Sequence, residues 1–210
     1  MALRSKKNIY YINPEWIVRP AGGRKDWKWY AEYHLHKHIY WPFQSLGGNW
    51  DQISTVKELF REDEMNELFV KKLPIQETTT YKELFAELKK NGFTRFPRTH
   101  SLEEINAYFE RVQKVYESMK SEGYKTSDEL GLPRMNEIHV RITRKGEFVK
   151  AGEGTHRLAM AKLLGIKEIP VVVDLVHSSL MKRWKKACKN TRCDPVAYGI
   201  ECLKEHIINT

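Results

Sequence analysis

The chain has 210 residues, of which 41% are hydrophobic and 30% are charged, and it carries a formal net charge of +9. No stretch approaches the roughly 18 uninterrupted apolar residues of a membrane span, and the N-terminus leads into no secretory core. We therefore expect a globular cytoplasmic protein with no membrane partner. The excess of basic residues favours anionic partners, and both nucleic acid and small phosphorylated ligands fit it.

A chain of this length most simply forms one domain with an appended part. We expect an N-terminal extension over 1–95 that packs on the core, a central domain over 96–177 and a basic helical tail over 178–210.

The N-terminal extension begins with a predicted strand at 9–12, which Asn13-Pro14 stops. Aromatic residues are concentrated before position 51. Such rings can stack on bases, but core packing is the more ordinary explanation for them. On a strand, His34, His36 and His38 would share one side, where a metal could meet them, yet no spaced carboxylate completes a site.

Helical periodicity predicts helices over 55–72 and 79–91. A longer amphipathic helix is predicted after Ser101-Leu102-Glu103-Glu104, which is typical of a capping box, and Gly123 should end it. Beyond it, alternating apolar residues over 138–142 and a Lys145-Gly146 turn into 147–149 predict a β-hairpin with one buried face.

The most informative segment is Lys150-Ala151-Gly152-Glu153-Gly154-Thr155-His156-Arg157-Leu158, which is followed by helical residues and an apolar strand over 169–173. It predicts a strand end, a glycine turn and the start of a short helix. The first amides of a helix lack internal acceptors and carry partial positive charge, so a phosphate can bind there. The alternative without a ligand is an ordinary strand–helix connection in which Arg157 is solvated.

Each residue type in this turn suits phosphate chemistry. Glycines at 152 and 154 permit positive φ and close approach of a ligand, and Thr155 is a predicted N-cap. Arg157 offers a planar fork to two phosphate oxygens. The predicted phosphate- and nucleotide-binding residues are Lys150, Gly152, Gly154, Thr155, His156 and Arg157.

Two residues of the turn are candidate catalytic groups. His156 can move a proton near neutral pH, and Glu153 can take a proton from an attacking hydroxyl or hold a Mg²⁺ on the phosphates.

The turn resembles the signature of the ParB/sulfiredoxin-like superfamily, and the resemblance covers about residues 100 to 176. Gly154-Thr155-His156-Arg157 stands where ParB proteins have Gly-Glu-Arg-Arg and sulfiredoxins have Gly-Cys-His-Arg. Glu153-Gly154-Thr155-His156-Arg157 is also similar to the Asp-Gly-His-Thr-Arg of ParB-like free serine kinases. Position 155 is Thr rather than the Cys that sulfiredoxins need, so sulfinic acid reduction is not expected.

The resemblance implies an α+β fold with a small mixed sheet flanked by helices, preceded here by the helical and aromatic extension. It also implies a nucleotide such as ATP, bound with Mg²⁺. An enzyme of this kind would transfer a phosphoryl group to a small hydroxylated acceptor or hydrolyse the nucleotide. The alternative is a ParB-like nucleic-acid-binding protein or nuclease that uses its basic surface.

The tail predicts a basic helix after Ser178, a turn at Cys193-Asp194-Pro195 and a second helix. It is too short for the helix-turn-helix region that follows this domain in ParB proteins. A zinc set can be counted from Cys188, Cys193, Cys202 and His206, although the cysteine spacing lacks the usual two-residue knuckle. Buried or idle thiols explain the cysteines more simply, and a disulfide is expected least.

Overall fold

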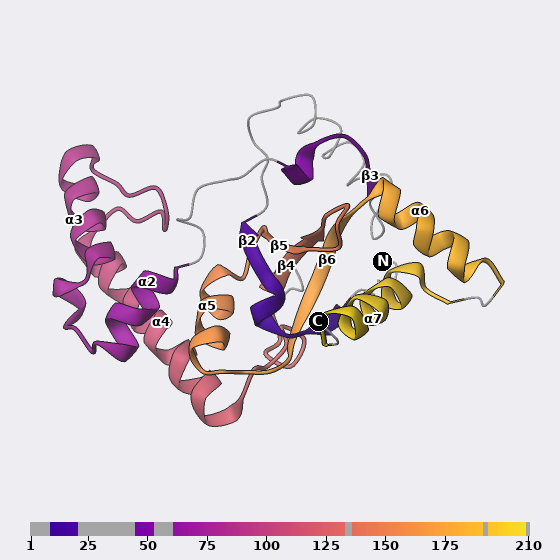
Figure 1. The fold of residues 1–210 in the computed structure, drawn as a ribbon. Helices are drawn as coiled ribbons and strands as arrows, with labels where there is room; N and C mark the ends of the chain where they lie inside the picture. The colour runs from indigo at the N-terminus through magenta and orange to yellow at the C-terminus, as the bar shows by residue number, and fades with distance from the viewer. Residues whose placement is uncertain (1–8, 21–44, 53–60, 133–135, 191–192, 209–210) are drawn as a thin grey trace. The chain divides into compact units, whose positions relative to one another are not determined.

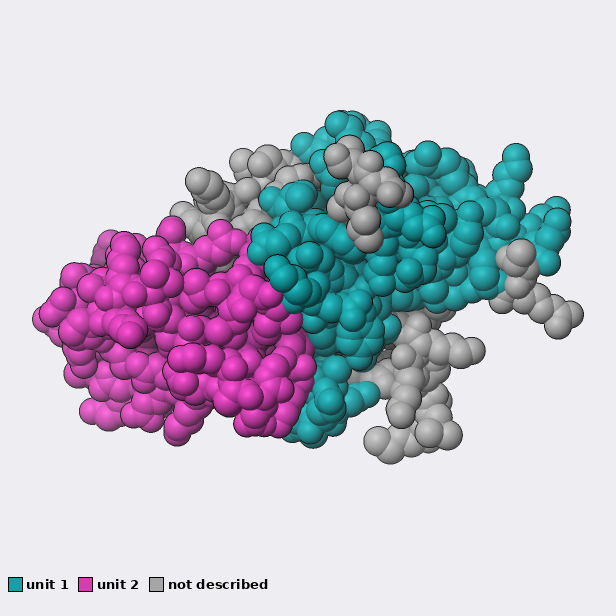
Figure 2. Space-filling model, turned by 60° about the horizontal axis from the view of Figure 1, so that its bottom comes forward, with its two compact units in different colours: residues 1–59, 126–154, 167–210 teal, residues 60–125, 155–166 magenta. Residues whose placement is uncertain are grey.

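The structure is a computed structural model that describes residues 9–20, 45–52, 61–132, 136–190 and 193–208. Within them helices accompany a mixed six-stranded sheet, so the predicted α+β class is confirmed. The chain divides into two compact units, which Figure 2 colours separately. Unit 1 contains residues 1–59, 126–154 and 167–210, and unit 2 contains residues 60–125 and 155–166. The predicted boundaries at 95 and 177 stay a prediction.

Unit 1 holds the sheet, whose strand order is β1-β6-β4-β5-β2, with β3 pairing additionally with β6 (Figure 1). The antiparallel pairs are β1 with β6 and β4 with β5, and the parallel pairs are β2 with β5, β3 with β6 and β4 with β6. The strands are β1 (Ile9–Ile12), β2 (Ile17–Pro20), β3 (Ser45–Leu46), β4 (Ile138–Ile142), β5 (Phe148–Ala151) and β6 (Ile169–His177).

Strand β6 is the most buried element of the sheet, since all nine of its residues are buried. It pairs with neighbours on both edges, so an apolar run suits it better than an alternating one. Ile12, Ile17 and Phe148 add large side chains to the core of this unit.

The predicted hairpin is confirmed as β4 and β5. Ile138, Val140 and Ile142 are buried, while the residues between them are partly exposed. Gly146 takes the positive φ that the connecting turn requires, and the Thr143 amide closes the turn on the carbonyl of Glu147.

The two predicted tail helices are α6 (Ser178–Ala187) and α7 (Pro195–Ile208), with a 3-10 turn, η7 (Cys188–Asn190), after the first. Helix α6 buries Leu180, Met181 and Trp184. Trp184 packs so closely on α7 that a β-carbon at Gly199 would lie 2.1 Å from its ring. Only glycine leaves room for the indole at this crossing.

Unit 2 is helical. Its elements are α2 (Glu62–Met65), the π-helical turn η4 (Asn66–Val70), the 3-10 turn η5 (Ile75–Glu77), α3 (Thr79–Asn91), α4 (Leu102–Glu122) and α5 (Thr155–Leu163). Two further 3-10 turns, η1 (Pro14–Trp16) and η2 (Trp50–Gln52), belong to unit 1.

The predicted helices of unit 2 are confirmed where their ends carry caps. Helix α3 coincides with the predicted 79–91, because Thr78 caps its first turn and Gly92 its last. In α4, Ser101 accepts from the Glu104 amide, as the capping-box pattern predicts. The predicted 55–72 helix is seen only from α2 to η4, since residues 53–60 lie outside the described part.

Candidate functional site

The glycine turn follows strand β5 in unit 1, and this strand contains a buried lysine, Lys150. The ammonium of Lys150 donates to the carbonyl oxygens of Ala151 at 2.6 Å, Gly152 at 3.0 Å and Glu153. An ammonium has three donors, so these bonds use all of them. Lys150 therefore holds the turn in shape, and its predicted contact with a phosphate stays a prediction.

The environment of Lys150 alters its basicity. The residue is 3% exposed, and burial lowers its pKa to about 8, while the charges of Asp174 and Glu153 work in the opposite direction. The cause is that removal from water disfavours the charged form.

Both glycines of the turn have the left-handed backbone that glycine tolerates. The φ of Gly152 is +51° and that of Gly154 is +84°. At position 154 a β-carbon would lie 2.7 Å from the Cα of Ile138, so no larger residue fits there. The sequence requirement for Gly154 is therefore steric as well as conformational.

Helix α5 begins with the next residue and belongs to unit 2. The helix starts at Thr155 itself, so Thr155 is its first residue and the predicted N-cap role for it is wrong. His156 and Arg157 follow in the first turn, and both are partly buried. The amides of this turn are among those that have no acceptor within a helix.

Arg157 contacts two residues of its own unit, Tyr124 and Lys125. Its guanidinium carbon is 5.1 Å from the ring centroid of Tyr124, a cation–π distance, and its Nη1 is 3.5 Å from the carbonyl oxygen of Lys125. These contacts orient the guanidinium.

His156 is part of a hydrogen-bond chain within unit 2. The hydroxyl of Tyr108 donates to Oε1 of Glu64 at 2.8 Å, and it lies 2.6 Å from Nε2 of His156. Because the tyrosine proton goes to Glu64, we assign the bond to His156 as Nε2–H donating to the tyrosine oxygen. Nδ1 then carries the lone pair of the neutral ring.

Burial sets the charge states in this chain. It lowers the pKa of His156, although the charge of Glu64 works in the opposite direction. Burial also raises the pKa of Tyr108, and Glu64 raises it further. At neutral pH we therefore expect a neutral imidazole and a protonated phenol at this site. No sequence pattern predicts these hydrogen bonds, since 44 residues separate Glu64 from Tyr108.

Glu153, the other candidate catalytic residue, has an exposed side chain in unit 1. A solvent-facing carboxylate suits Mg²⁺, which keeps several waters and takes one or two protein carboxylates together with phosphate oxygens. The roles of Glu153 as base or magnesium ligand stay predictions.

The cysteines of the tail differ from what the sequence predicted for them. Cys188 and Cys193 form a disulfide, the outcome expected least, while Cys202 is a free thiol. Sulfurs in a disulfide are not thiolates and cannot bind zinc in this state, and no metal-binding group of three His, Cys, Asp or Glu occurs among the described residues. In this state Cys188 and Cys193 are therefore not available as zinc ligands, and the zinc set with His206 stays a prediction. Disulfides are typical of oxidising compartments, so the cytoplasmic location stays a prediction.

Other expectations fall outside the described part of the chain. His34, His36 and His38, with most of the N-terminal aromatic block, belong to residues 21–44. Across the described ranges, no helix is long and apolar enough to cross a membrane.

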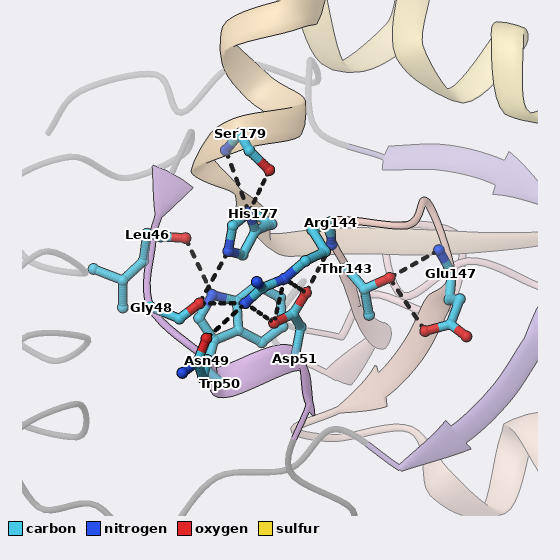
Figure 3. Close-up of polar contacts among 10 residues, drawn as sticks. All are labelled: Leu46, Gly48, Asn49, Trp50, Asp51, Thr143, Arg144, Glu147, His177 and Ser179. Atoms are coloured by element: carbon cyan, nitrogen blue, oxygen red, sulfur yellow. Dashed lines mark hydrogen bonds and ion pairs between the residues drawn. The ribbon is translucent and has the colours of Figure 1, made fainter.

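A polar cluster in unit 1 secures the segment Gly47–Asp51 (Figure 3). The guanidinium of Arg144 contacts both carboxylate oxygens of Asp51, at 2.7 and 2.8 Å, and also the carbonyl of Gly48 and the side chain of Asn49. Burial alone would raise the pKa of Asp51, but the hydrogen bonds from Arg144 outweigh it and lower the pKa. This arrangement fixes a loop to the β4–β5 turn.

His177 completes that cluster (Figure 3). Its Nε2 lies 3.1 Å from the carbonyl oxygen of Gly48, and its Nδ1 lies 2.8 Å from the hydroxyl of Ser179. Trp50 packs beside the imidazole and donates to the carbonyl of Leu46. Since both ring nitrogens have protein partners, the cluster is a structural one.

Unit 1 also contains a hydrogen-bonded histidine–aspartate pair that the sequence did not predict. Nδ1 of His139, on β4, lies 2.7 Å from a carboxylate oxygen of Asp174, on β6. The register of β4 with β6 shifts between Val140 and Arg141 and leaves Asp174 as the extra residue. Such a bulge has no signature in a single sequence.

No family model, curated protein or solved structure matches the chain. The ParB/sulfiredoxin-like resemblance therefore rests on the residues of the turn and stays a prediction.

Proposed function

We propose that the chain is a nucleotide-binding protein of the ParB/sulfiredoxin-like class that transfers a phosphoryl group from a nucleotide to a small hydroxylated acceptor or to water. The proposal rests on one observation about consecutive residues of the glycine turn and α5. A glycine that admits no side chain is followed directly by a helix whose first turn contains His156 and Arg157. Backbone amides at such a position, with a guanidinium, suit phosphate oxygens.

The roles follow from the contacts in unit 2. The amides of the first turn of α5 and the fork of Arg157 bind phosphate oxygens. His156 is held through Nε2 by Tyr108, so its Nδ1 is oriented to accept a proton or contact the ligand. Phosphoryl transfer depends mainly on positioning and charge neutralisation, which these groups supply.

In the proposed reaction the acceptor hydroxyl or water passes its proton to Nδ1 of His156, which accepts it as the new bond to phosphorus forms. The acceptor oxygen forms a bond to the terminal phosphorus, the bond from that phosphorus to the bridging oxygen breaks, and its electron pair leaves with the nucleoside diphosphate. Mg²⁺, held partly by Glu153, would neutralise phosphate charge when bound.

Thermal unfolding with added ligand tests the proposal. ATP, ADP or CTP with Mg²⁺ should raise the melting temperature, since a ligand that binds the folded state stabilises it. Arg157→Ala should abolish the rise. The matched control is Arg95→Ala, an arginine of the same unit whose side chain is 73% exposed, and it should keep the full rise. No rise with any nucleotide would count decisively against the proposal.

A second candidate, nucleic-acid binding, is favoured by one observation on α6. Lys182, Arg183, Lys185 and Lys186 are all exposed on this helix, while its large apolar residues are buried. Such a face suits a phosphate backbone without reading bases. Affinity for duplex DNA or RNA should then fall steeply with salt, because cations are released from the backbone on binding. No binding at low salt would exclude this candidate.

A further inference from the structure

The loop between α3 and α4, which lies wholly within unit 2, presents a phenylalanine to solvent. Phe96 is 76% exposed, more than any other large hydrophobic residue in the described ranges. Single apolar residues at a protein surface are common, so this exposure alone assigns no role to the ring. The loop around Phe96 supplies the further observations.

Hydrogen bonds hold this loop in one shape. Its ends are closed by two buried threonines: the Thr94 amide donates to the carbonyl of Thr99 at 2.8 Å, and the Thr99 amide donates to Oγ1 of Thr94 at 3.0 Å. The hydroxyl of Thr94 also donates to the carbonyl of Pro97. The carbonyl of Phe96 accepts from Nη2 of Arg61 at 3.2 Å. The backbone next to the exposed ring is therefore fixed before any partner binds.

The segment that contains the ring is positively charged. Residues 88–100 include no acidic residue, and their lysines and arginines are Lys89, Lys90, Arg95 and Arg98. All of these cations are exposed. The two lysines belong to the last turn of α3, and the arginines belong to the loop. Such a segment is complementary to a chain of phosphates.

The two arginines of the loop have different neighbours. The guanidinium carbon of Arg98 is 5.1 Å from the ring centroid of Phe93, a cation–π contact that does not neutralise its charge. Arg95 is instead ion-paired with Glu87 at 3.7 Å, so we leave it out of the proposed contacts. We call Lys89, Lys90, Phe96 and Arg98 the α3–α4 surface.

An exposed ring among cations suits single-stranded nucleic acid. Unpaired bases stack on aromatic side chains whatever their sequence, while basic side chains bind the phosphates between them. A duplex fits less well, because its bases already stack on one another. A membrane fits less well too, because one phenylalanine side chain gains only about 1.5–3 kcal/mol on burial.

We infer that the α3–α4 surface binds single-stranded nucleic acid, with one base stacked on Phe96 and the adjacent phosphates on Lys89, Lys90 and Arg98. Because the loop is already fixed, little conformational entropy of the protein is lost on binding. This inference is independent of the proposed phosphoryl transfer, which uses other residues. It also differs from the α6 candidate, which concerns another unit and contacts with the phosphate backbone alone.

Fluorescence anisotropy with a labelled oligothymidylate tests the stacking. Phe96→Ala should lower the affinity about 5- to 150-fold, as expected for the loss of one stacked base. Phe96→Trp should retain the affinity, since it keeps an aromatic face. Val70→Ala replaces another exposed apolar residue of unit 2, which is 56% exposed, and should bind like wild type. The melting temperature of Phe96→Ala should equal that of wild type, because the ring is not part of the core.

The salt dependence tests the phosphate contacts separately. Arg98→Ala should reduce the slope of log affinity against log salt by about 0.7, the value for one phosphate contact on a single strand. Phe96→Ala should leave this slope unchanged, because it removes no cation. Lys114→Gln, at an exposed lysine of α4, is the control and should keep the wild-type slope. Ultraviolet cross-linking followed by peptide mass spectrometry should find the oligonucleotide on Phe96.

Three results would overturn the inference: no binding of the oligothymidylate at low salt, a Phe96→Ala affinity within about twofold of wild type, or an equal loss of affinity for a duplex of the same length. Anionic vesicles that bind wild type but not Phe96→Ala, with oligothymidylate binding unaffected, would assign the ring to a membrane and also overturn it. The nucleotide-induced rise in melting temperature tests the proposed function on its own, so the failure of either proposal leaves the other standing.

Discussion

Gly154 lies against the main chain of Glu137, and a β-carbon at position 154 would be 3.0 Å from the carbonyl oxygen of that residue. The close approach ties the turn before α5 to the residue before β4. It explains physically why a glycine is needed at the point where the chain enters the helix.

Gly154→Ala should therefore destabilise the protein by about 2–4 kcal/mol, since both the left-handed backbone and the steric clash contribute. Gly165→Ala is the matched control, because its φ is +65° and its β-carbon would have no neighbour within 4 Å. It should cost about 1–2 kcal/mol, from the left-handed backbone alone. Urea unfolding measures both, and equal losses would contradict the close packing at position 154.

The hydrogen-bond chain of His156 predicts a pH effect. Burial lowers the pKa of His156 below its ordinary 6.5, so the unfolded chain takes up this proton first as the pH falls. The contribution of His156 to stability should be full above pH 6.5 and decline below it. His156→Gln should accordingly lose less melting temperature than wild type between about pH 7 and 5. Parallel curves for the two proteins would show that His156 is not buried as a neutral ring.

Asp51 predicts a second loss of stability with falling pH, at a lower pH than that of His156. Its pKa lies below the ordinary 3.8 because of Arg144, so its contribution to stability is present above that pH and is lost as the pH falls through the folded-state pKa. Asp51→Asn should be less stable than wild type at pH 7, and the gap should close below about pH 4. Glu110→Gln, an exposed acid on α4, should show no comparable gap at pH 7. A gap for Asp51→Asn that is independent of pH would refute the ion pair as its cause.

The disulfide predicts a redox-dependent stability. Closing the short loop between Cys188 and Cys193, five residues apart, should stabilise the fold by roughly 2 kcal/mol. The double variant Cys188→Ser/Cys193→Ser should lose this amount, and a reductant should then have no further effect on it. Cys202→Ser should unfold like wild type. Three titratable thiols in the unreduced wild-type protein would show that the bridge does not form.

Local chemistry explains which elements the sequence could predict. Helices α3 and α4 have capping residues at both ends, and the β4–β5 hairpin has an alternating face and a glycine at its turn. These signals lie within a few residues of the structure they specify. The predicted helix over 55–72 differs from the structure at Asn66–Val70, which forms a π-helical turn that no sequence pattern predicts.

Long-range partners could not be predicted in the same way. Asp51 meets Arg144 across 93 residues, and His139 meets Asp174 across 35 residues and a β-bulge. Neither spacing carries a periodic signal, because only the tertiary fold brings these residues together. The same holds for the lysine of the turn: its sequence position suggested a phosphate contact, whereas its ammonium binds the carbonyls of its own loop.

A crystal structure of the protein soaked with ADP and Mg²⁺ would show whether the first turn of α5 binds phosphate. We expect phosphate oxygens within hydrogen-bond distance of the amides in that turn, with the guanidinium of Arg157 turned onto them. A nucleotide bound elsewhere, with Arg157 still packed on Tyr124, would contradict this expectation.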